Sequence, residues 1–301
     1  MELLQKPQYS ATLWSLLLSL FLIFNNINSL EATCRPLNLL EIKPENTTFR
    51  GNLIFPLRDE KNIIYLVDLE RAIDHILRLQ LLKVPVFKGN KLIVLKNIIA
   101  LLHYLNPLAT DEGKLYINNI FWSIQSQSEV TQEFLNTTIN AKELLDKSYK
   151  GNDYLGCRGS ESGLRDFNCS LWTLFHYLTV AASQLPECIQ PGAVLWAFHG
   201  YTQYFMGCPE CFRNLWFYAQ NKQIDDVKTH DEEILWLWKA HNHFNRKLAG
   251  SISDDPFFAK KQFPPQKYCR RCRNFRGEWR TNEVLKYLKS IYGLDKLYYQ
   301  E

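Results

Sequence analysis

The spacing of apolar residues along the chain predicts helices. In the first half, two stripes recur at helical intervals, with Pro85 and Pro107 interrupting the pattern; their members are Leu66, Leu69, Ile73, Ile76 and Leu77, then Leu92, Leu95, Ile98, Ile99, Leu102 and Leu105. In the second half, similar patterns predict helices over 170–183, 192–207 running straight into Cys208, 231–248, and a last one through Val284, Leu285, Leu288 and Ile291. Alternating strand patterns are scarce, so we predict an all-α protein.

The N-terminus predicts a targeting segment. The apolar run Leu13–Phe24 follows Lys6 and precedes a polar stretch, which is typical of a signal peptide over 1–29, with cleavage between Ser29 and Ala32. It is shorter than the ~20 residues that span a bilayer, so no stable membrane anchor is expected; an uncleaved anchor or a buried helix is the alternative. We then expect a leader or linker over 30–61, a helix-rich region over 62–150 and a second domain over 151–301.

Composition narrows the class of protein. With 301 residues and 46% hydrophobic content, the chain can bury a full core. Its net charge of +4 is mild and its Lys and Arg residues look scattered, so no nucleic-acid partner is expected.

Cysteines and glycosylation sequons indicate the compartment. Eight cysteines and the sequons at Asn46 and Asn136 favour the secretory pathway, with the extracellular space, the Golgi and the endoplasmic reticulum lumen all open. A third sequon at Asn168 has a cysteine in its middle and is expected to be unused. Cys34 and Cys188 stand apart from the others and could pair or stay free.

Two CxxC pairs, Cys208/Cys211 and Cys269/Cys272, could bind zinc, cycle electrons or act as inert staples. Roughly 57 residues separate them, against about 15 to 20 in a zinc ribbon, so zinc is disfavoured and no metal site is predicted. Two thiols on one helical turn can close a readily exchanged disulfide, and a helix N-terminus stabilises a thiolate. Cys269/Cys272 lies among Pro and Arg residues, and for this pair we favour an inert structural disulfide.

A helix face in the second domain combines aromatic and polar side chains. Trp238, His241, Asn242 and Asn245 fall within one arc, and Trp172 and His176 lie four apart on an earlier helix. Such a surface suits a planar heteroaromatic ligand, by stacking on its rings and hydrogen-bonding its edges. Ordinary core packing is the alternative. His241 and His243, two apart, lie on different faces and do not form a metal pair.

Taken together, these segments resemble the quiescin sulfhydryl oxidases and, within them, the Erv/ALR flavin-binding domain. The resemblance covers about residues 62–301, and its segments are 156–161, 165–176, 205–211, 235–250, 255–272 and, for the upstream helix-rich region, 65–107. The resemblance implies a helical bundle that holds FAD against the Cys208/Cys211 disulfide. Cys208 would exchange with dithiol substrates, and Cys211 would face the flavin, which passes two electrons to oxygen to give hydrogen peroxide.

The resemblance also assigns roles to further residues. Eight positions match those that contact FAD in the family: Arg165, Trp172, His176, Trp238, His241, Asn242, Asn245 and Lys260. Cys157 with Cys169, and Cys269 with Cys272, match its structural disulfides. We therefore predict a FAD-dependent thiol oxidase acting on protein thiols or small dithiols.

The chain departs from the family pattern in three places. No thioredoxin-like CGHC pair stands upstream, although that pair oxidises substrates in the family, so a separate thioredoxin-like partner, small thiols or a truncated product are the options. Asn214 and Phe263 occupy places that the family usually gives to His and Trp, changes expected to weaken FAD binding or shift its potential without preventing binding. These departures keep open an alternative, a non-catalytic, disulfide-rich interaction module descended from such an oxidase.

Overall fold

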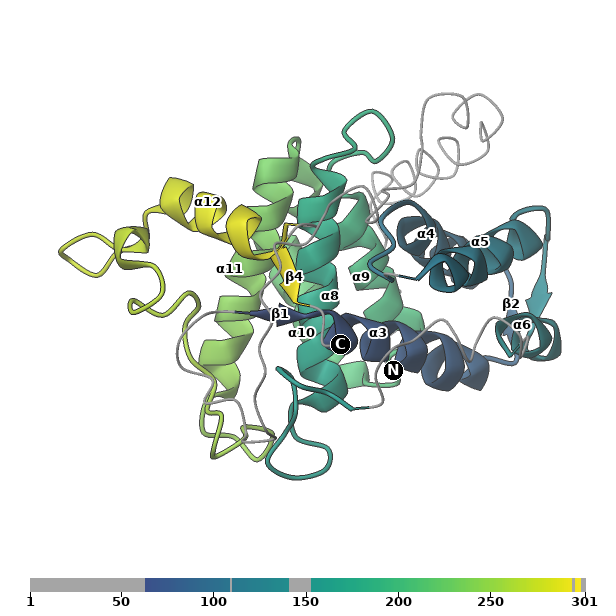
Figure 1. Cartoon of the computed structure of the whole chain (residues 1–301), viewed down its shortest axis with the longest axis horizontal. Coiled ribbons are helices and arrows are strands. Elements are labelled where there is room, and N and C mark those ends of the chain that lie inside the picture. Colours follow the sequence, from purple (N-terminus) through teal and green to yellow (C-terminus); the bar gives the residue numbers. More distant parts are fainter. Residues whose placement is uncertain (1–62, 109, 141–152, 294–295, 299–301) are drawn as a thin grey trace, which may run out of the picture. The chain divides into compact units, whose positions relative to one another are not determined.

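The computed structural model describes residues 63–108, 110–140, 153–293 and 296–298 (Figure 1). The chain divides into two compact units, Met1–Arg35 and Pro36–Glu301, and all described residues belong to the second. The segments predicted as signal peptide and leader, over 1–29 and 30–61, lie outside them, as does Cys34. The regular secondary structure of the described residues is helical apart from two-residue strands, which confirms the all-α prediction there.

The helix-rich region contains four α-helices in its described residues, α3 (Leu66–Asp74), α4 (Asn90–Tyr104), α5 (Asp111–Gln125) and α6 (Gln132–Ile139). Helix α3 continues into a π-helix, His75–Gln80, and a 3-10 turn, Leu81–Lys83. Thr110 and Thr131 cap α5 and α6 by accepting backbone N–H groups, those of Gly113 and Phe134. The apolar stripes predicted α3 and α4, whereas these two capped helices were missed.

The described residues include four short strands, which pair as two ladders. Strand β1 (Ile64–Tyr65) pairs in parallel with β4 (Leu297–Tyr298), so that Ile64 lies opposite Leu297. Strand β2 (Val86–Phe87) pairs antiparallel with β3 (Val130–Thr131). These ladders bring segments distant in sequence together without forming a sheet layer.

The second region is a helical bundle made of α8 (Asp166–Ala182), α9 (Ala193–Tyr204), α10 (Pro209–Asn221) and α11 (His230–Leu248), with α12 (Thr281–Ile291) against α11 (Figure 1). Helix α11 starts at a capping box, in which Thr229 accepts the N–H of Glu232 and the Glu232 carboxylate accepts that of Thr229. Gly250, with φ +72°, follows its end, as the sequence predicts.

The predicted continuous helix from 192 to 207 is wrong at its C-terminal end. Helix α9 stops at Tyr204, Gly207 adopts a φ of +67°, and a separate helix, α10, begins at Pro209. Left-handed backbone suits glycine, and proline suits the first turn of a helix because its missing N–H would be unsatisfied there. The Cys208/Cys211 pair therefore starts a helix of its own.

The two regions pack against each other. Helix α3 lies along α8, and the buried carboxylate of Asp68 on α3 accepts the backbone N–H groups of Leu155, at 2.7 Å, and Cys157, at 3.0 Å. Helix α4 packs on α9 so closely that a Cβ on Gly200 would lie 2.6 Å from Cγ2 of Val94. The expected domain boundary near residue 150 falls in 141–152, outside the described residues.

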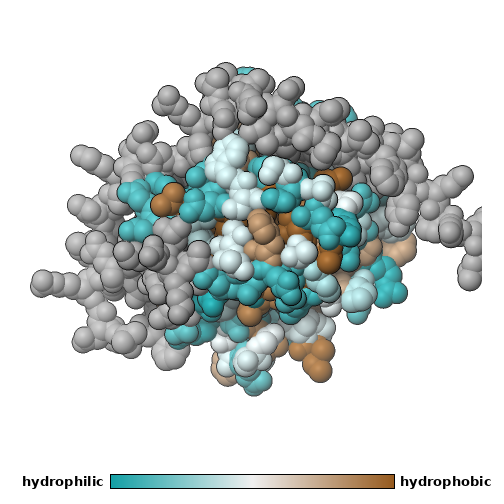
Figure 2. All heavy atoms as spheres, turned by 90° about the vertical axis from the view of Figure 1, so that its right-hand side faces the viewer, coloured by the Kyte–Doolittle hydropathy of each residue, from teal (hydrophilic) through white to brown (hydrophobic). Residues whose placement is uncertain are grey.

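The surface that includes α5 and α6 is mixed in polarity. Figure 2 shows apolar side chains scattered among hydrophilic ones on this face, and the exposed apolar residues of the two helices are Leu115, Trp122 and Phe134. Single exposed apolar residues are normal on protein surfaces. In the described part of the chain, none of the helices combines the length and apolarity needed to cross a bilayer.

Candidate active site

The first CxxC pair forms a disulfide at the N-terminus of α10. Cys208 is the N-cap residue, and its Sγ accepts the backbone N–H of Cys211 at 3.2 Å. Both cysteines are partly exposed. The free N–H groups and positive dipole end of the helix stabilise negative charge at this position, whereas the neighbouring Glu210 carboxylate opposes it. The geometry therefore favours a thiolate whenever the disulfide is opened.

Neighbouring helices hold α10 in place. Phe212, directly after the disulfide, meets the ring of His199 on α9 edge-on, at 5.4 Å between centroids. Burial lowers the pKa of His199 to about 4, so this ring is neutral near pH 7. Asn214 accepts a hydrogen bond from Nζ of Lys247 on α11 at 2.6 Å. The resemblance predicts a histidine at this position. The amide found there instead links α10 to α11 through this hydrogen bond.

Four rings form a stacked column between α8, α11 and the end of α12. Trp172 stacks on His241 with 4.4 Å between centroids, and His176 lies nearly parallel to both His241 and Tyr292, at 5.3 Å from each. Trp172 and His241 are partly exposed, whereas His176 and Tyr292 are buried. The column therefore has one accessible end and one sealed end.

The two histidines of the column are neutral at physiological pH. Burial and the neighbouring His241 ring hold the pKa of His176 well below its usual value. Burial, and then the positive charge of Lys260, lower the pKa of His241 to about 4. Nε2 of His176 and Nδ1 of His241 share a hydrogen bond of 3.1 Å, so one ring donates and the other accepts.

Three other predicted ligands on α11 fix the segment that follows the helix. Trp238 Nε1 and Asn242 Nδ2 both donate to the backbone carbonyl of Phe263, at 2.6 and 2.7 Å, and Asn242 Oδ1 accepts the N–H of Phe263 at 2.7 Å. Asn245 Nδ2 donates to the carbonyl of Lys261 at 3.1 Å. Their polar groups hold backbone in place beside the ring column.

Arg165 and Lys260, the two cationic residues predicted to contact FAD, lie near two loops that are linked by the buried side chain of Asp255. Arg165 donates to the carbonyl of Gly156 at 2.8 Å and lies over the ring of Phe258, and Lys260 pairs with Asp254 at 3.4 Å. The carboxylate of Asp255, fully buried, accepts the N–H and the hydroxyl of Ser160.

Hydrogen bonds control the charge of this buried aspartate. Burial alone raises the pKa of Asp255, but hydrogen bonds from Ser160 and from the N–H groups of Phe257 and Phe258 outweigh it and leave the pKa lowered. Asp255 therefore stays ionised and links the loop before α8 to the loop after α11.

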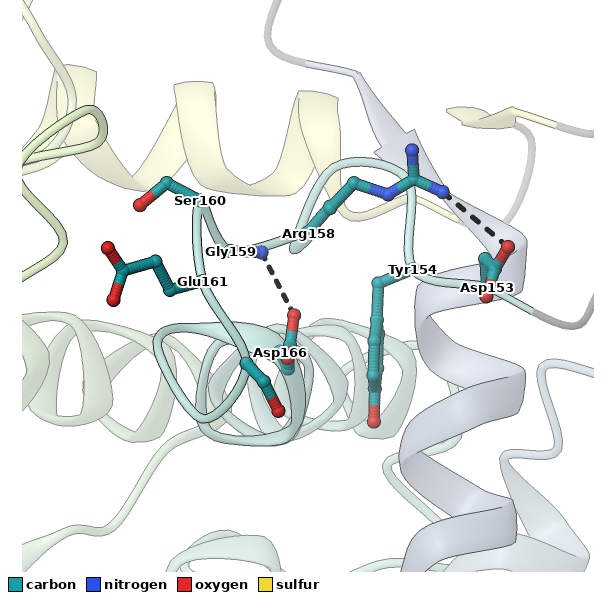
Figure 3. A pocket seen from close by; sticks show the side chains of 8 residues that line it. Asp153, Tyr154, Arg158, Gly159, Ser160, Glu161 and Asp166 are labelled. Carbon is teal, nitrogen blue, oxygen red and sulfur yellow. Dashed lines mark hydrogen bonds and ion pairs between the residues drawn. The ribbon is translucent and has the colours of Figure 1, made fainter.

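A pocket of about 260 Å³ opens in the loop before α8 (Figure 3). Arg158 pairs with Asp153 at 3.5 Å across it, and Gly159 donates its N–H to Asp166 at 2.9 Å. Glu161 adds a third carboxylate to its lining. This volume lies below the roughly 300–1,000 Å³ of ligand sites, and the acidic groups would repel a diphosphate, so the pocket does not suit a dinucleotide.

The other cysteines in the described part of the chain are also bonded. Disulfides join Cys157 to Cys169 and Cys269 to Cys272, the pairing that the resemblance implies. Cys188 is likewise in a disulfide. The second CxxC pair lies in a 3-10 turn, Arg270–Cys272, and Cys272 is fully buried.

The residues present fit FAD. A planar ring system needs a ring face on which to stack, and the accessible end of the column is the partly exposed ring of Trp172, which is itself stacked on His241. A diphosphate needs cations, and Lys260 is close enough to His241 for its charge to lower the histidine's pKa. This donor set, stacked rings with a nearby cation, matches the chemistry of a flavin dinucleotide.

Some members of the site were not predicted. Tyr292, which closes the column, follows an apolar stripe that indicates only core packing. Phe198 meets Trp172 edge-on at 4.9 Å, but it follows the apolar run 193–197 of α9, which indicates only core packing. The role of Asp255 had one signal in the sequence, the Asp-Asp-Pro turn, since aspartate is typical of loops in which a side chain binds backbone N–H groups.

Comparison with known proteins identifies the family. The family described as flavin adenine dinucleotide (FAD)-dependent sulfhydryl oxidase matches residues 60–160, and the Erv1 / Alr family matches residues 169–264. Human sulfhydryl oxidase 1 is 34% identical over 245 residues, which are 77% of this chain and 32% of the relative. Human sulfhydryl oxidase 2 is 36% identical over 251 residues, and the match covers 79% of this chain and 36% of the relative.

A solved structure agrees with these relatives. The sulfhydryl oxidase fragment of human QSOX1 superposes with a TM-score of 0.73 and 32% identity, covering 79% of this chain and 98% of the fragment. The chain spans about a third of the length of the curated relatives it matches. Both the sequence and the fold therefore show that the chain belongs to the quiescin sulfhydryl oxidase family of FAD-dependent enzymes.

Proposed function

We propose that this chain is itself a FAD-dependent thiol oxidase whose redox centre is Cys208–Cys211. The observation that carries the proposal is a partly exposed disulfide at the start of α10, a helix that contacts α9, which in turn contacts a stacked ring column suited to a flavin. The family relation supports the same chemistry.

The disulfide would be reduced by two successive thiol attacks. A substrate thiolate attacks Cys208 Sγ, the S–S bond breaks, and Cys211 leaves as a thiolate that the N-terminus of α10 stabilises. A second substrate thiolate attacks the substrate sulfur of the mixed disulfide and releases Cys208. The substrate is then a disulfide, and the enzyme pair is a dithiol that has gained two electrons.

Bound FAD would supply the two-electron acceptor that reoxidises the pair and delivers the electrons to oxygen. The balanced reaction is two thiols plus O₂ giving one disulfide plus hydrogen peroxide. The column residues Trp172, His176 and His241 would hold the cofactor, with the two histidines as neutral hydrogen-bonding groups. Arg165 and Lys260 would neutralise the diphosphate, and Trp238, Asn242 and Asn245 would keep the 261–263 backbone beside it.

We further propose dithiols of proteins or small molecules as substrates, with a separate thioredoxin-like protein as a candidate relay. The partial exposure of Cys208 supports direct access from solution.

A secretory location, in the extracellular space, the Golgi or the endoplasmic reticulum, is proposed from the disulfides and from Asn136, which is exposed on α6 as a glycan acceptor requires. Expression in a secreting cell, followed by glycosidase treatment, should shift the mobility of the wild type more than that of Asn136→Gln.

The function is tested by purifying the chain with its disulfides intact and measuring bound FAD and thiol-dependent oxygen uptake. We expect one FAD per chain and hydrogen peroxide formed in step with oxygen consumed when a small dithiol is added. A chain that stays colourless after refolding with excess FAD would contradict the proposal and favour the non-catalytic interaction module.

A further inference from the structure

Positive charge is concentrated in one segment before α12. Residues 261–280 contain seven cations and one acid, Glu278; the cations are Lys261, Lys267, Arg270, Arg271, Arg273, Arg276 and Arg280. The chain as a whole has 35 Lys and Arg against 31 Asp and Glu, so the remainder carries 28 against 30. The expectation of scattered charge was therefore wrong for this segment, which alone is +6.

This basic hairpin, defined as residues 269–280, is held in a fixed conformation. The Cys269–Cys272 disulfide closes its base, and Arg280 donates its N–H to the carbonyl of Cys272 at 2.8 Å. The side chain of Asn274 accepts the N–H groups of Arg276, at 2.9 Å, and Glu278, at 3.0 Å. A bridge between Arg273 and Trp279 joins the two arms. A ligand would thus meet ordered cations and lose little entropy in fixing them.

Most of these arginines are exposed and form no ion pair with the described residues. Arg270, Arg271, Arg276 and Arg280 are exposed, and within the described ranges no carboxylate lies within 4 Å of their guanidinium groups. The one acid of the hairpin, Glu278, accepts a hydrogen bond from Asn274 at 2.8 Å. The hairpin therefore presents net positive charge to solvent, although Arg271 and Arg280 act on Glu283 of α12, whose pKa is lowered first by the Lys286 hydrogen bond and also by these two charges.

A hollow continues this surface at the start of α12. Its volume is about 330 Å³, and its lining runs from Trp279 and Arg280 through Thr281 and Asn282 to Glu283. Glu283 is engaged by Lys286 at 3.0 Å. The hollow gives the basic hairpin a concave edge with Arg280 on its rim, large enough for a small anionic group.

The side chains distinguish between classes of polyanion. A single-stranded nucleic acid needs exposed ring faces for its bases, but the guanidinium of Arg273 covers the face of Trp279 at 3.5 Å. A protein partner usually needs an apolar centre, whereas here Phe275, 93% exposed, stands singly among arginines. Arginine's planar fork binds the oxygens of sulfate in pairs. The hairpin thus favours dispersed sulfate groups over bases or an apolar surface.

We propose that the basic hairpin is a binding surface for a sulfated polysaccharide. Exposed arginines on both arms would pair with sulfate groups of one polysaccharide chain, and Phe275 would pack against a sugar ring. This surface is separate from the Cys208–Cys211 site and does not depend on the oxidase activity.

The test measures binding of the full chain to heparin at several salt concentrations. The triple variant Arg270→Gln, Arg271→Gln, Arg276→Gln removes three exposed charges, and Lys91→Gln, Lys222→Gln, Lys239→Gln removes three exposed charges elsewhere. We expect the hairpin variant to bind at least ~10-fold more weakly, with a salt dependence reduced by about two to three ionic contacts, and the control to stay within about threefold of wild type. Equal melting temperatures check that all three proteins are folded.

Three outcomes would overturn the proposal. Equal losses in the two triple variants would show a nonspecific effect of net charge. Undiminished binding of fully desulfated heparin would show that sulfate is not recognised. Tighter binding of polyglutamate or of single-stranded DNA than of heparin, at equal charge, would assign the surface to a protein or nucleic-acid partner.

Discussion

The chain carries two CxxC disulfides that share a spacing and differ in their surroundings. Cys208–Cys211 begins the 13-residue helix α10, with both cysteines partly exposed. Cys269–Cys272 lies in a three-residue 3-10 turn, with Cys272 fully buried. The first therefore combines a helix N-terminus with access from solution, and the second closes the base of a hairpin.

Judged by neighbouring charges alone, the second pair would be the more reactive one. Arg270 and Arg271 lie between the cysteines of the second pair and favour thiolates, whereas Glu210 lies within the first and opposes them. What favours the first pair is its helix and the contact of that helix with α9, which also touches the ring column. A CxxC motif thus indicates that a disulfide can form. The surrounding helices and loops determine whether that disulfide is redox-active or structural.

The largest expected effect separates the two pairs by activity. Cys208→Ser should lower thiol-dependent oxygen uptake by at least ~10³-fold because it removes the sulfur that substrate attacks. Cys269→Ser should leave turnover within about threefold of wild type. Steady-state oxygen uptake with a small dithiol measures both variants, and similar losses in the two would remove the distinction drawn here.

The ring column should matter for flavin binding. Trp172→Ala removes the accessible stacking face, and we expect FAD affinity to fall by ~10–100-fold, in line with losses of about 1–3 kcal/mol per stacked ring. Trp122→Ala, on the exposed face of α5, is the matched control and should bind FAD as the wild type does. Fluorescence titration of FAD into the apoprotein gives both affinities; equal affinities in the two variants would place the flavin elsewhere.

The neutral histidines predict acid sensitivity. The folded-state pKa of His241, about 4, lies below its ordinary value of 6.5, so the unfolded chain binds more protons between these limits. The free energy of unfolding should therefore fall as the pH drops from 6.5 to 4, by on the order of 1–3 kcal/mol for this group. Denaturant titrations at several pH values measure it.

Two histidine variants assign that pH dependence. His241→Gln should make the decline shallower by the share of this ring, while the buried His176 and His199, whose pKa values are also lowered, continue to contribute. His243→Gln, which changes an exposed side chain two residues away, should retain most of it. A decline that is the same in both variants would show that other groups cause the acid sensitivity.

The smallest expected effect concerns the second disulfide as a structural clip. Replacing Cys269 and Cys272 with Ser opens a very short loop and should cost about 1–2 kcal/mol, a fall of roughly 2–8 °C in melting temperature. Oxygen uptake below the melting transition should be unchanged. A calorimetric scan paired with an activity assay would reveal a redox role if turnover, rather than stability, is what is lost.

The sequence predicts those parts of the fold that depend on local pattern. The stripe through Leu66 and Ile73 predicted α3, and Gly250 marked the end of α11. The break before Cys208 was missed because Phe205 and Met206 keep the segment apolar through a turn, and hydrophobicity does not report backbone direction. Gly207 and Pro209 were the local signs of that turn.

The site was accessible from sequence mainly through the family resemblance. Residues on α8 and α11 meet at Trp172 and His241, as the shared ligand assignment implies, although their roles in binding FAD stay predictions. Tyr292 could not be found, because a contact with His176, more than a hundred residues away in sequence, leaves no local pattern. The basic hairpin could have been seen by counting charge in a 20-residue window.

Electron transfer by Cys208–Cys211, and not by the second CxxC pair, can be observed in one anaerobic experiment. Flavin-loaded wild type, Cys211→Ser and Cys269→Ser are mixed with excess dithiol without oxygen, and the visible flavin absorbance is followed. We predict rapid bleaching in wild type and Cys269→Ser, and retained absorbance in Cys211→Ser over the same period. Bleaching of Cys211→Ser at the wild-type rate, or loss of bleaching in Cys269→Ser, would contradict the account.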